Sequence, residues 1–319
     1  MRKGTNPRSQ EIQQQLASIK LKELFERYSN ARPNLKANTL RDYRCCMNNY
    51  FADWRDVPLQ NITRDKVEKR HQELSRKSPA RANIAMRFLR ALLNFASDIQ
   101  GPDGQPVISD NPVERLSRQK RWNAIEPRST FLTPIILPLW WQALYSLPAK
   151  QHENEIVRDY LLFLLFTGLR REEAMTLRWE QVDFEQRSFK VLDTKNRKDH
   201  ELPMSTFLLT LLTERKERCG DSPWVFPSSK SKTGHIIEPR YQIALIEAQC
   251  GIRINSHDLR RTFASYGESL GFSFIVLKHL LNHKVKDITG RYVQITLEQK
   301  REPMERIAKY ILENAEKKS

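Results

Sequence analysis

The stretch IVRDYLLFLLFTGLRREE, residues 156–173, joins an apolar run to a glycine and a cluster of charged side chains. A helix that is apolar on all faces is typical of the core of a large domain. The run is far too short to span a bilayer. The stretch therefore predicts a buried helix from about Ile156 to Phe166 that delivers Arg170 to the edge of the core, with Gly168 permitting a tight approach.

Further reactive side chains follow this stretch in a fixed order. Asp193-Thr-Lys-Asn contributes Lys195, His-Asp-Leu-Arg contributes His257 and Arg260, Leu-Asn-His contributes His283, and Arg-Tyr contributes Tyr292. Arg260 precedes His283 by 23 residues, and Tyr292 follows His283 by 9. None of these short motifs is rare alone, but their combination is hard to obtain by chance.

The set has the chemistry needed to attack a phosphodiester with a phenol. A planar guanidinium, charged at all relevant pH values, can neutralise the non-bridging oxygens, which suits Arg170 and Arg260. Lysine can protonate the leaving 5′-oxygen, and Lys195 is the candidate, with Lys190, Arg197 and Lys198 as its rivals.

The remaining groups complete this candidate site. The phenol of Tyr292 is the nucleophile, His257 assists it, and His283 is a second donor to the phosphate. Glu173 lies one helical turn beyond Arg170 and is expected to orient an active-site side chain. The covalent intermediate keeps the bond energy, so the chemistry predicts neither a metal nor any other cofactor.

These motifs resemble those of the tyrosine recombinases, the phage integrase family, whose signature is Arg, Lys, His-x-x-Arg, His or Trp, and Tyr. The resemblance implies an N-terminal core-binding domain, a catalytic domain and a 3′-phosphotyrosine intermediate. It also implies a homotetramer on synapsed duplex DNA with specific recombination sites. Asn282 stands where relatives usually have glycine, and asparagine is the best substitute in a left-handed helix terminus.

The charge of the chain points to a polyanionic partner, because the net charge is +16 and the pI is about 9.8. Residues 1–128 hold 25 Lys and Arg against 14 Asp and Glu, so this part is expected to grip phosphates. The candidate DNA contacts are Lys36, Arg41, Arg44, Arg81 and Arg87 on outer helix faces and Arg118, Lys120 and Arg121 in a basic linker.

Composition divides the chain into five segments. These segments are a polar tail at 1–17, a helical domain at 18–116, a linker at 117–130, a catalytic domain at 131–302 and a C-terminal helix at 303–319. The fold class predicted is mainly α with a small β-sheet: an N-terminal all-α helical bundle followed by an α+β catalytic domain.

Helical spacing predicts helices near 21–28, 39–50, 63–74 and 81–99, the last with Ile84 and Phe88 on its inner stripe. Thr133 is expected to cap the first helix of the catalytic domain, with Pro134 in its first turn. Alternation predicts strands at 188–192 and 200–203, with Lys195 at the turn between them.

The C-terminal segment carries Met304, Ile307, Ala308, Ile311 and Leu312 on one helical stripe. This stripe either packs on its own domain or, as the resemblance suggests, docks on the neighbouring protomer.

Four cysteines in so long a chain make no disulfide framework, and the N-terminus has no signal peptide pattern. The expected location is therefore the cytoplasm, in association with the nucleoid and without a membrane partner. His279 and His283 have zinc-like spacing, but Leu280 occupies the place of the glutamate that a zinc protease needs, so no metal site is expected.

The sequence therefore predicts a site-specific DNA recombinase, an integrase that inserts or excises a mobile element, with DNA-bending accessory factors among its expected partners. A Xer-like housekeeping resolvase would use the same chemistry. A non-catalytic DNA-binding regulator is the alternative from another class.

Overall fold

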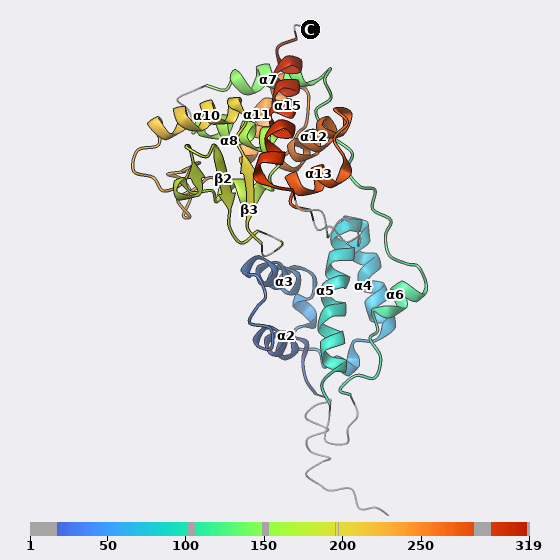
Figure 1. Ribbon diagram of the computed structural model, residues 1–319. Helices are drawn as coiled ribbons and strands as arrows, with labels where there is room; N and C mark the ends of the chain where they lie inside the picture. Colours follow the sequence, from blue (N-terminus) through green and yellow to red (C-terminus); the bar gives the residue numbers. More distant parts are fainter. Residues whose placement is uncertain are drawn as a thin grey trace, which may run out of the picture. The chain divides into compact units, whose positions relative to one another are not determined.

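The computed structural model describes residues 18–100, 106–148, 153–194, 196, 198–283 and 295–317. The chain divides into two compact units, Met1–Pro127 and Arg128–Ser319 (Figure 1). Helices dominate both units, and the second also contains a three-stranded sheet. The predicted fold class, mainly α with a small β-sheet, is confirmed. A search of the described residues finds no helix with the length and apolar character needed to span a membrane.

The first unit is a bundle of helices around an aromatic core. Phe88 lies at its centre, with ring centroids 5.8 Å from Phe25, 5.0 Å from Tyr43 and 6.1 Å from Phe51. Ile84, which helical spacing placed on the inner stripe, is 45% exposed, so that assignment is wrong. The elements are α2 (Leu21–Asn30), α3 (Ala37–Tyr50), η1 (Ala52–Trp54), η2 (Leu59–Asn61), α4 (Arg64–Lys77), α5 (Pro79–Ser97) and α6 (Glu114–Arg118).

The start of the predicted linker packs against the first unit. Asn123 donates from its side-chain amide to Ser75 Oγ at 2.8 Å, and its carbonyl oxygen accepts from Asn83 at 2.9 Å. Trp122 packs edge-on against His71 with ring centroids 6.1 Å apart. These two side chains anchor this part of the chain to α4 and α5, which composition does not reveal.

In the second unit, the sheet and the other helices pack around one buried helix. Its elements are α7 (Leu137–Tyr145), α8 (Asn154–Thr167), α9 (Arg171–Met175), η3 (Trp179–Gln181), β1 (Val182–Asp183), β2 (Ser188–Val191), β3 (His200–Pro203), α10 (Thr206–Arg218), α11 (Arg240–Cys250), α12 (Ser256–Ser269), α13 (Phe274–Leu280) and α15 (Leu297–Ala315).

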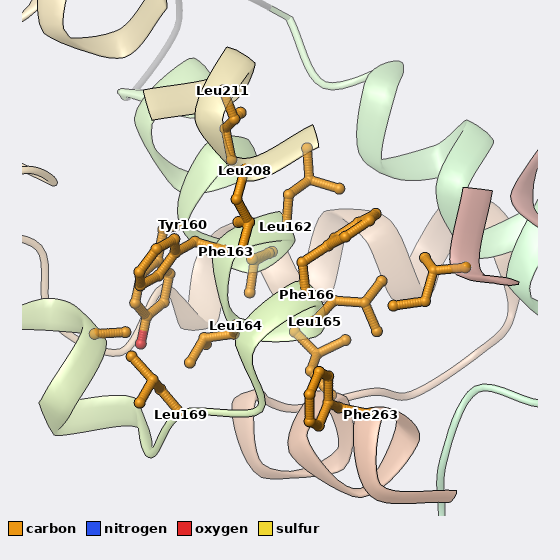
Figure 2. Packing of buried hydrophobic residues seen from close by; sticks show 14 of the residues in the cluster. Tyr160, Leu162, Phe163, Leu164, Leu165, Phe166, Leu169, Leu208, Leu211 and Phe263 are labelled. Carbon is orange, nitrogen blue, oxygen red and sulfur yellow. The ribbon is translucent and has the colours of Figure 1, made fainter. Parts of the chain in front are cut away.

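Helix α8 is the buried helix that the apolar run predicts. Figure 2 shows its side chains packed between Leu208 and Leu211 of α10 and Phe263 of α12. The helix ends at Gly168, whose φ of +62° lies in the left-handed region. A Cβ at this position would lie 2.6 Å from Phe263 Cδ1 and 2.9 Å from Leu281 Cδ2, so only glycine fits without rearrangement.

The sheet is antiparallel, in the order β1-β2-β3. The two longer strands were predicted, but β1 was missed, because two residues are too few for alternation to show. The first helix of the unit begins at Leu137 rather than beside Thr133. The Thr133 carbonyl oxygen instead closes a turn by accepting from the backbone N–H of Leu137 at 3.0 Å.

The C-terminal helix packs on its own unit. Helix α15 begins at Leu297, where Thr296 caps it, and not at Pro303 as expected. Met304, Ile307 and Ile311 are fully buried, and the helix contacts β3, α7, α8 and α12. The argument for a docking helix at 303–319 assumed that this apolar stripe lacked a partner in its own chain. The structure contradicts that assumption.

Candidate active site

Two successive carbonyl oxygens at the C-terminal end of α13 hold the two candidate arginines. The last carbonyl groups of a helix have no partner inside the helix, and the helix dipole favours cations there. The carbonyl oxygen of Leu281 accepts from Arg260 at 2.6 Å, and that of Asn282 accepts from Arg170 at 3.1 Å. Residues far apart in sequence thus converge on one helix end.

Asn282 gives this helix end its shape. Its φ is +48°, so the expected left-handed terminus is confirmed. The backbone N–H of His283 donates to the Lys278 carbonyl oxygen at 2.8 Å, and that of Asn282 donates to His279 at 3.2 Å. This pair of bonds is the Schellman arrangement, which ends a helix and turns the next residue outward. His283 is consequently exposed beside the arginines.

Glu173 fixes Arg170 at two points. One carboxylate oxygen accepts from the guanidinium at 2.8 Å, and the other accepts from the Arg170 backbone N–H at 3.0 Å. Glu173 is only 7% exposed, so this ion pair is shielded from solvent. The contact agrees with the expectation that Glu173 orients an active-site side chain.

Arg260 is held more deeply. It is 4% exposed and donates to the Gly168 carbonyl oxygen at 2.6 Å as well as to Leu281. Burial, and secondly the charge of Arg170, lower its pKa to about 10. The guanidinium therefore stays charged at neutral pH, and it ties the end of α8 to the end of α13.

The N-terminus of α12 places His257 close to Arg260. Asn255 caps the helix by accepting from the backbone N–H groups of His257 at 2.9 Å and Asp258 at 3.2 Å. Asp258 returns a bond by accepting from the Asn255 backbone N–H at 3.1 Å. Because residues three apart share a helix face, His257 and Arg260 point to the same side.

Both candidate histidines favour the neutral form. Burial, followed by the charges of Arg260 and Arg170, lowers the pKa of His283 to about 4. The pKa of His257 is also lowered, by burial first and then by Arg261 and Arg260. At pH 7 each imidazole therefore has one N–H donor and one basic nitrogen.

His200 is a supporting residue that the sequence did not assign. It is 6% exposed, and its Nε2 lies 2.9 Å from the Leu280 carbonyl oxygen, so Nε2 carries the hydrogen and donates. The bond attaches strand β3 to the same end of α13.

The burial of His200 predicts a pH-dependent stability. Its pKa falls from 6.5 to about 4, chiefly through burial. Between these values the unfolded chain binds more protons, so stability is full above pH 6.5 and falls as the pH drops towards 4. His200→Gln keeps a donor but cannot titrate. In urea melts it should lose about 1.5 kcal/mol less than the wild type between pH 6.5 and 5; parallel losses would contradict the assignment.

Lys195 and Tyr292 lie outside the described residues, so their roles stay predictions. Arg197, one rival of Lys195, also lies outside them. Of the other rivals, Lys190 pairs with Asp199 at 3.1 Å, and Lys198 is exposed.

The candidate DNA contacts in the first unit differ in their surroundings. Arg41, Arg44 and Arg81 are exposed on α3 and α5. Arg87 is also exposed and lies 5.9 Å above the Trp122 ring. Lys36 is half-buried at the start of α3.

The three basic residues of the predicted linker differ in whether they already have acidic partners. Arg118 forms an ion pair with Asp110 at 3.5 Å, and Arg121 pairs with Glu68. Lys120 is exposed with a φ of +52°. A DNA backbone would therefore compete with carboxylates for two of these three side chains.

Comparisons with known proteins agree with this geometry. The model of the phage integrase family matches residues 141–299. The prophage integrase IntF of Escherichia coli is 29% identical over 278 residues, which are 83% of this chain and 56% of IntF. The tyrosine recombinase XerA of Pyrococcus furiosus is 30% identical over 156 residues, 47% of this chain and 54% of XerA. The chain thus spans little more than half the length of these two relatives.

A solved structure shares the fold. A lambda integrase tetramer bound to a Holliday junction gives a TM-score of 0.67 at 20% identity, with 93% of this chain and 86% of that chain covered. The ordered motifs, the family match and the shared fold lead to one conclusion: the chain belongs to the phage integrase family, the tyrosine recombinases.

Proposed function

We propose that the protein is a site-specific recombinase that cuts and rejoins duplex DNA through a 3′-phosphotyrosine on Tyr292. The main support is that Arg170 and Arg260 bind adjacent carbonyl oxygens of the helix end that presents His283. A pentacoordinate phosphorane concentrates negative charge on its non-bridging oxygens, which guanidinium groups stabilise. Each guanidinium has five N–H donors, so its bonds to the protein leave donors for phosphate.

The reaction assigns one task to each group. The Tyr292 phenol oxygen attacks phosphorus, and the bond to the 5′-oxygen breaks. Lys195 gives its proton to that oxygen, while His257 takes the phenol proton, which its lowered pKa permits because the imidazole is neutral. His283 donates a hydrogen bond to a non-bridging oxygen. In the joining step a 5′-hydroxyl attacks the phosphotyrosine and the proton transfers reverse.

The partners follow from this reaction. Strand exchange needs two duplexes, so we propose a homotetramer on synapsed recombination sites, in association with the nucleoid. The lambda integrase tetramer on a Holliday junction, whose fold this chain shares, supports that assembly. DNA-bending accessory factors belong to the same proposal.

Among recombinase roles we favour integration or excision of a mobile element. The prophage integrase is 29% identical over 83% of this chain, against 26% over 84% for the XerA of Thermococcus onnurineus. Short direct repeats beside the gene would mark an attachment site, and a plasmid carrying both repeats should recombine. Recombination only at a chromosomal dimer-resolution site would favour the Xer-like role.

A simple test distinguishes the proposed enzyme from a non-catalytic regulator with the same fold. On a nicked duplex that loses its 5′ fragment after cleavage, the enzyme should accumulate as a denaturant-resistant protein–DNA adduct. EDTA should leave the yield unchanged, since the proposed mechanism uses no metal. Specific binding without any adduct would identify a regulator.

The exposed arginines of α3 should contribute to DNA affinity through phosphate contacts. Arg41→Gln and Arg44→Gln in the full chain should each lower the slope of log affinity against log salt by about 1. Arg64→Gln is the matched control, because Arg64 already pairs with Asp110. Slopes equal to the wild-type slope in Arg41→Gln and Arg44→Gln would remove α3 from the DNA interface.

A further inference from the structure

The side chain of Asn282 joins the end of α13 to the turn between β2 and β3. Its Nδ2 donates to Thr194 Oγ1 at 2.9 Å. The side-chain amide of Asn196 donates to the Asn282 main-chain oxygen at 2.7 Å and to its Oδ1 at 3.3 Å. Thr194 and Asn196 are the chain neighbours of Lys195 on either side.

These bonds are made in a shielded place. Thr194 is 2% exposed, and its hydroxyl donates to the Lys198 carbonyl oxygen at 2.8 Å. The same oxygen accepts from Asn282 and from the Asn196 backbone N–H at 3.3 Å. One donor and two acceptors are the full capacity of a hydroxyl. Loss of the Asn282 amide would therefore remove one of the bonds that hold this buried hydroxyl.

The Asn282 backbone and side chain have separable tasks. The backbone supplies the left-handed conformation and the carbonyl oxygen that accepts from Arg170. Glycine can supply both of these. The side-chain amide adds the link to the turn at Thr194, which glycine cannot make.

We propose that Asn282 is a positioning residue that holds the Thr194–Asn196 turn at a fixed distance from the arginines, so that the general acid reaches the leaving oxygen. The inference rests on the proposed function, in which Lys195 is that acid. It assigns to Asn282 an effect on proton delivery that is separate from its effect on the helix end.

The test uses the full chain, nicked duplexes and Asn282→Gly. On an ordinary phosphodiester, the variant should cleave about 10- to 100-fold more slowly, since small misplacement of a catalytic group is costly, with DNA affinity within about twofold. On a duplex with sulfur in place of the bridging 5′-oxygen, the leaving thiolate needs no proton. There its rate should return to within about threefold of the wild-type rate on that substrate.

Conservative variants give an independent measure of the same link. Asn282→Asp keeps the left-handed preference but loses the donor to Thr194, and should show a similar defect. Thr194→Val removes the link from the other side, and adding Asn282→Gly to it should cost little more than either change alone. Thr194→Val also replaces Asn282→Gly as the test if the glycine variant does not fold.

Lys195→Ala separates the possible failures. If it cleaves normally, or if the sulfur substrate does not rescue it, the proposed role of Lys195 is wrong. If it is rescued while Asn282→Gly stays slow on the sulfur substrate, Asn282 acts through the arginines or His283, and the positioning proposal is overturned. Normal cleavage of the ordinary substrate by Asn282→Gly would overturn it as well.

Discussion

Arg260→Ala is expected to slow DNA cleavage by at least about a hundredfold, because one preorganised donor to a developing anion is commonly worth two to three decades in rate. DNA affinity should fall much less, since the other proposed phosphate contacts remain. The loss also leaves the carbonyl oxygens of Gly168 and Leu281 without this donor. We therefore also expect about 1–3 kcal/mol of lost stability, visible in urea melts.

Arg170→Ala is the matched comparison, because Arg170 is more exposed and bonds only one carbonyl oxygen at this helix end. It should lose a similar factor in rate, and it should also lose stability because the shielded Glu173 carboxylate is left without its partner. Single-turnover cleavage at saturating enzyme separates chemistry from binding. If either variant loses affinity and rate by the same factor, that arginine binds the ground state and has no special part in the transition state.

Gly168→Ala should damage both the fold and the site. The added methyl would enter the space of the Phe263 ring, and alanine at a φ of +62° is strained, so we expect about 2–4 kcal/mol of lost stability. Any displacement of the Gly168 carbonyl oxygen also moves Arg260. The fraction of Gly168→Ala protein that folds should therefore cleave DNA more slowly than the wild type. Melting temperature and single-turnover rate measure the two effects.

Gly251→Ala is the control, because its φ is +70° but nothing lies within 4 Å of the added Cβ. It carries the backbone strain alone, so its loss should stay near 1 kcal/mol with normal cleavage. Equal losses in the two variants would show that packing at Gly168 does not matter.

Local patterns predicted the elements that depend on local chemistry. The run from Tyr160 to Phe166 is apolar on every face and lies in the buried helix α8. Asn282, at a position where the family usually has glycine, forms the left-handed helix end, because asparagine tolerates that conformation. The ordered motifs identified the family without any information on distance.

Long-range packing was harder to predict. The carbonyl oxygens of Leu281 and Asn282 have no signature in the sequence, since every residue carries the same group. An apolar stripe such as that of Ile307 and Ile311 has the same sequence pattern whether it packs on its own domain or on a neighbouring protomer. The tertiary structure shows that these two side chains are buried in their own unit. The sequence likewise predicts that Trp122 belongs to a linker, whereas the structure shows its ring packed against His71.

The identity of the nucleophile is the central claim. Two other tyrosines of the second unit, Tyr266 and Tyr310, pack edge-on against each other with ring centroids 5.0 Å apart, and Tyr266 is 1% exposed. Burial raises the pKa of the Tyr266 phenol, which makes it a poorer nucleophile. Trypsin should release residues 292–300, with Tyr292 as the one tyrosine.

Mass spectrometry of the tryptic digest of the protein–DNA adduct tests this claim most directly. A 3′-phosphonucleotide on the peptide of residues 292–300, together with no adduct from Tyr292→Phe at unchanged DNA affinity, is the result we predict. A nucleotide on any other peptide, or an adduct that persists in Tyr292→Phe, would contradict the account.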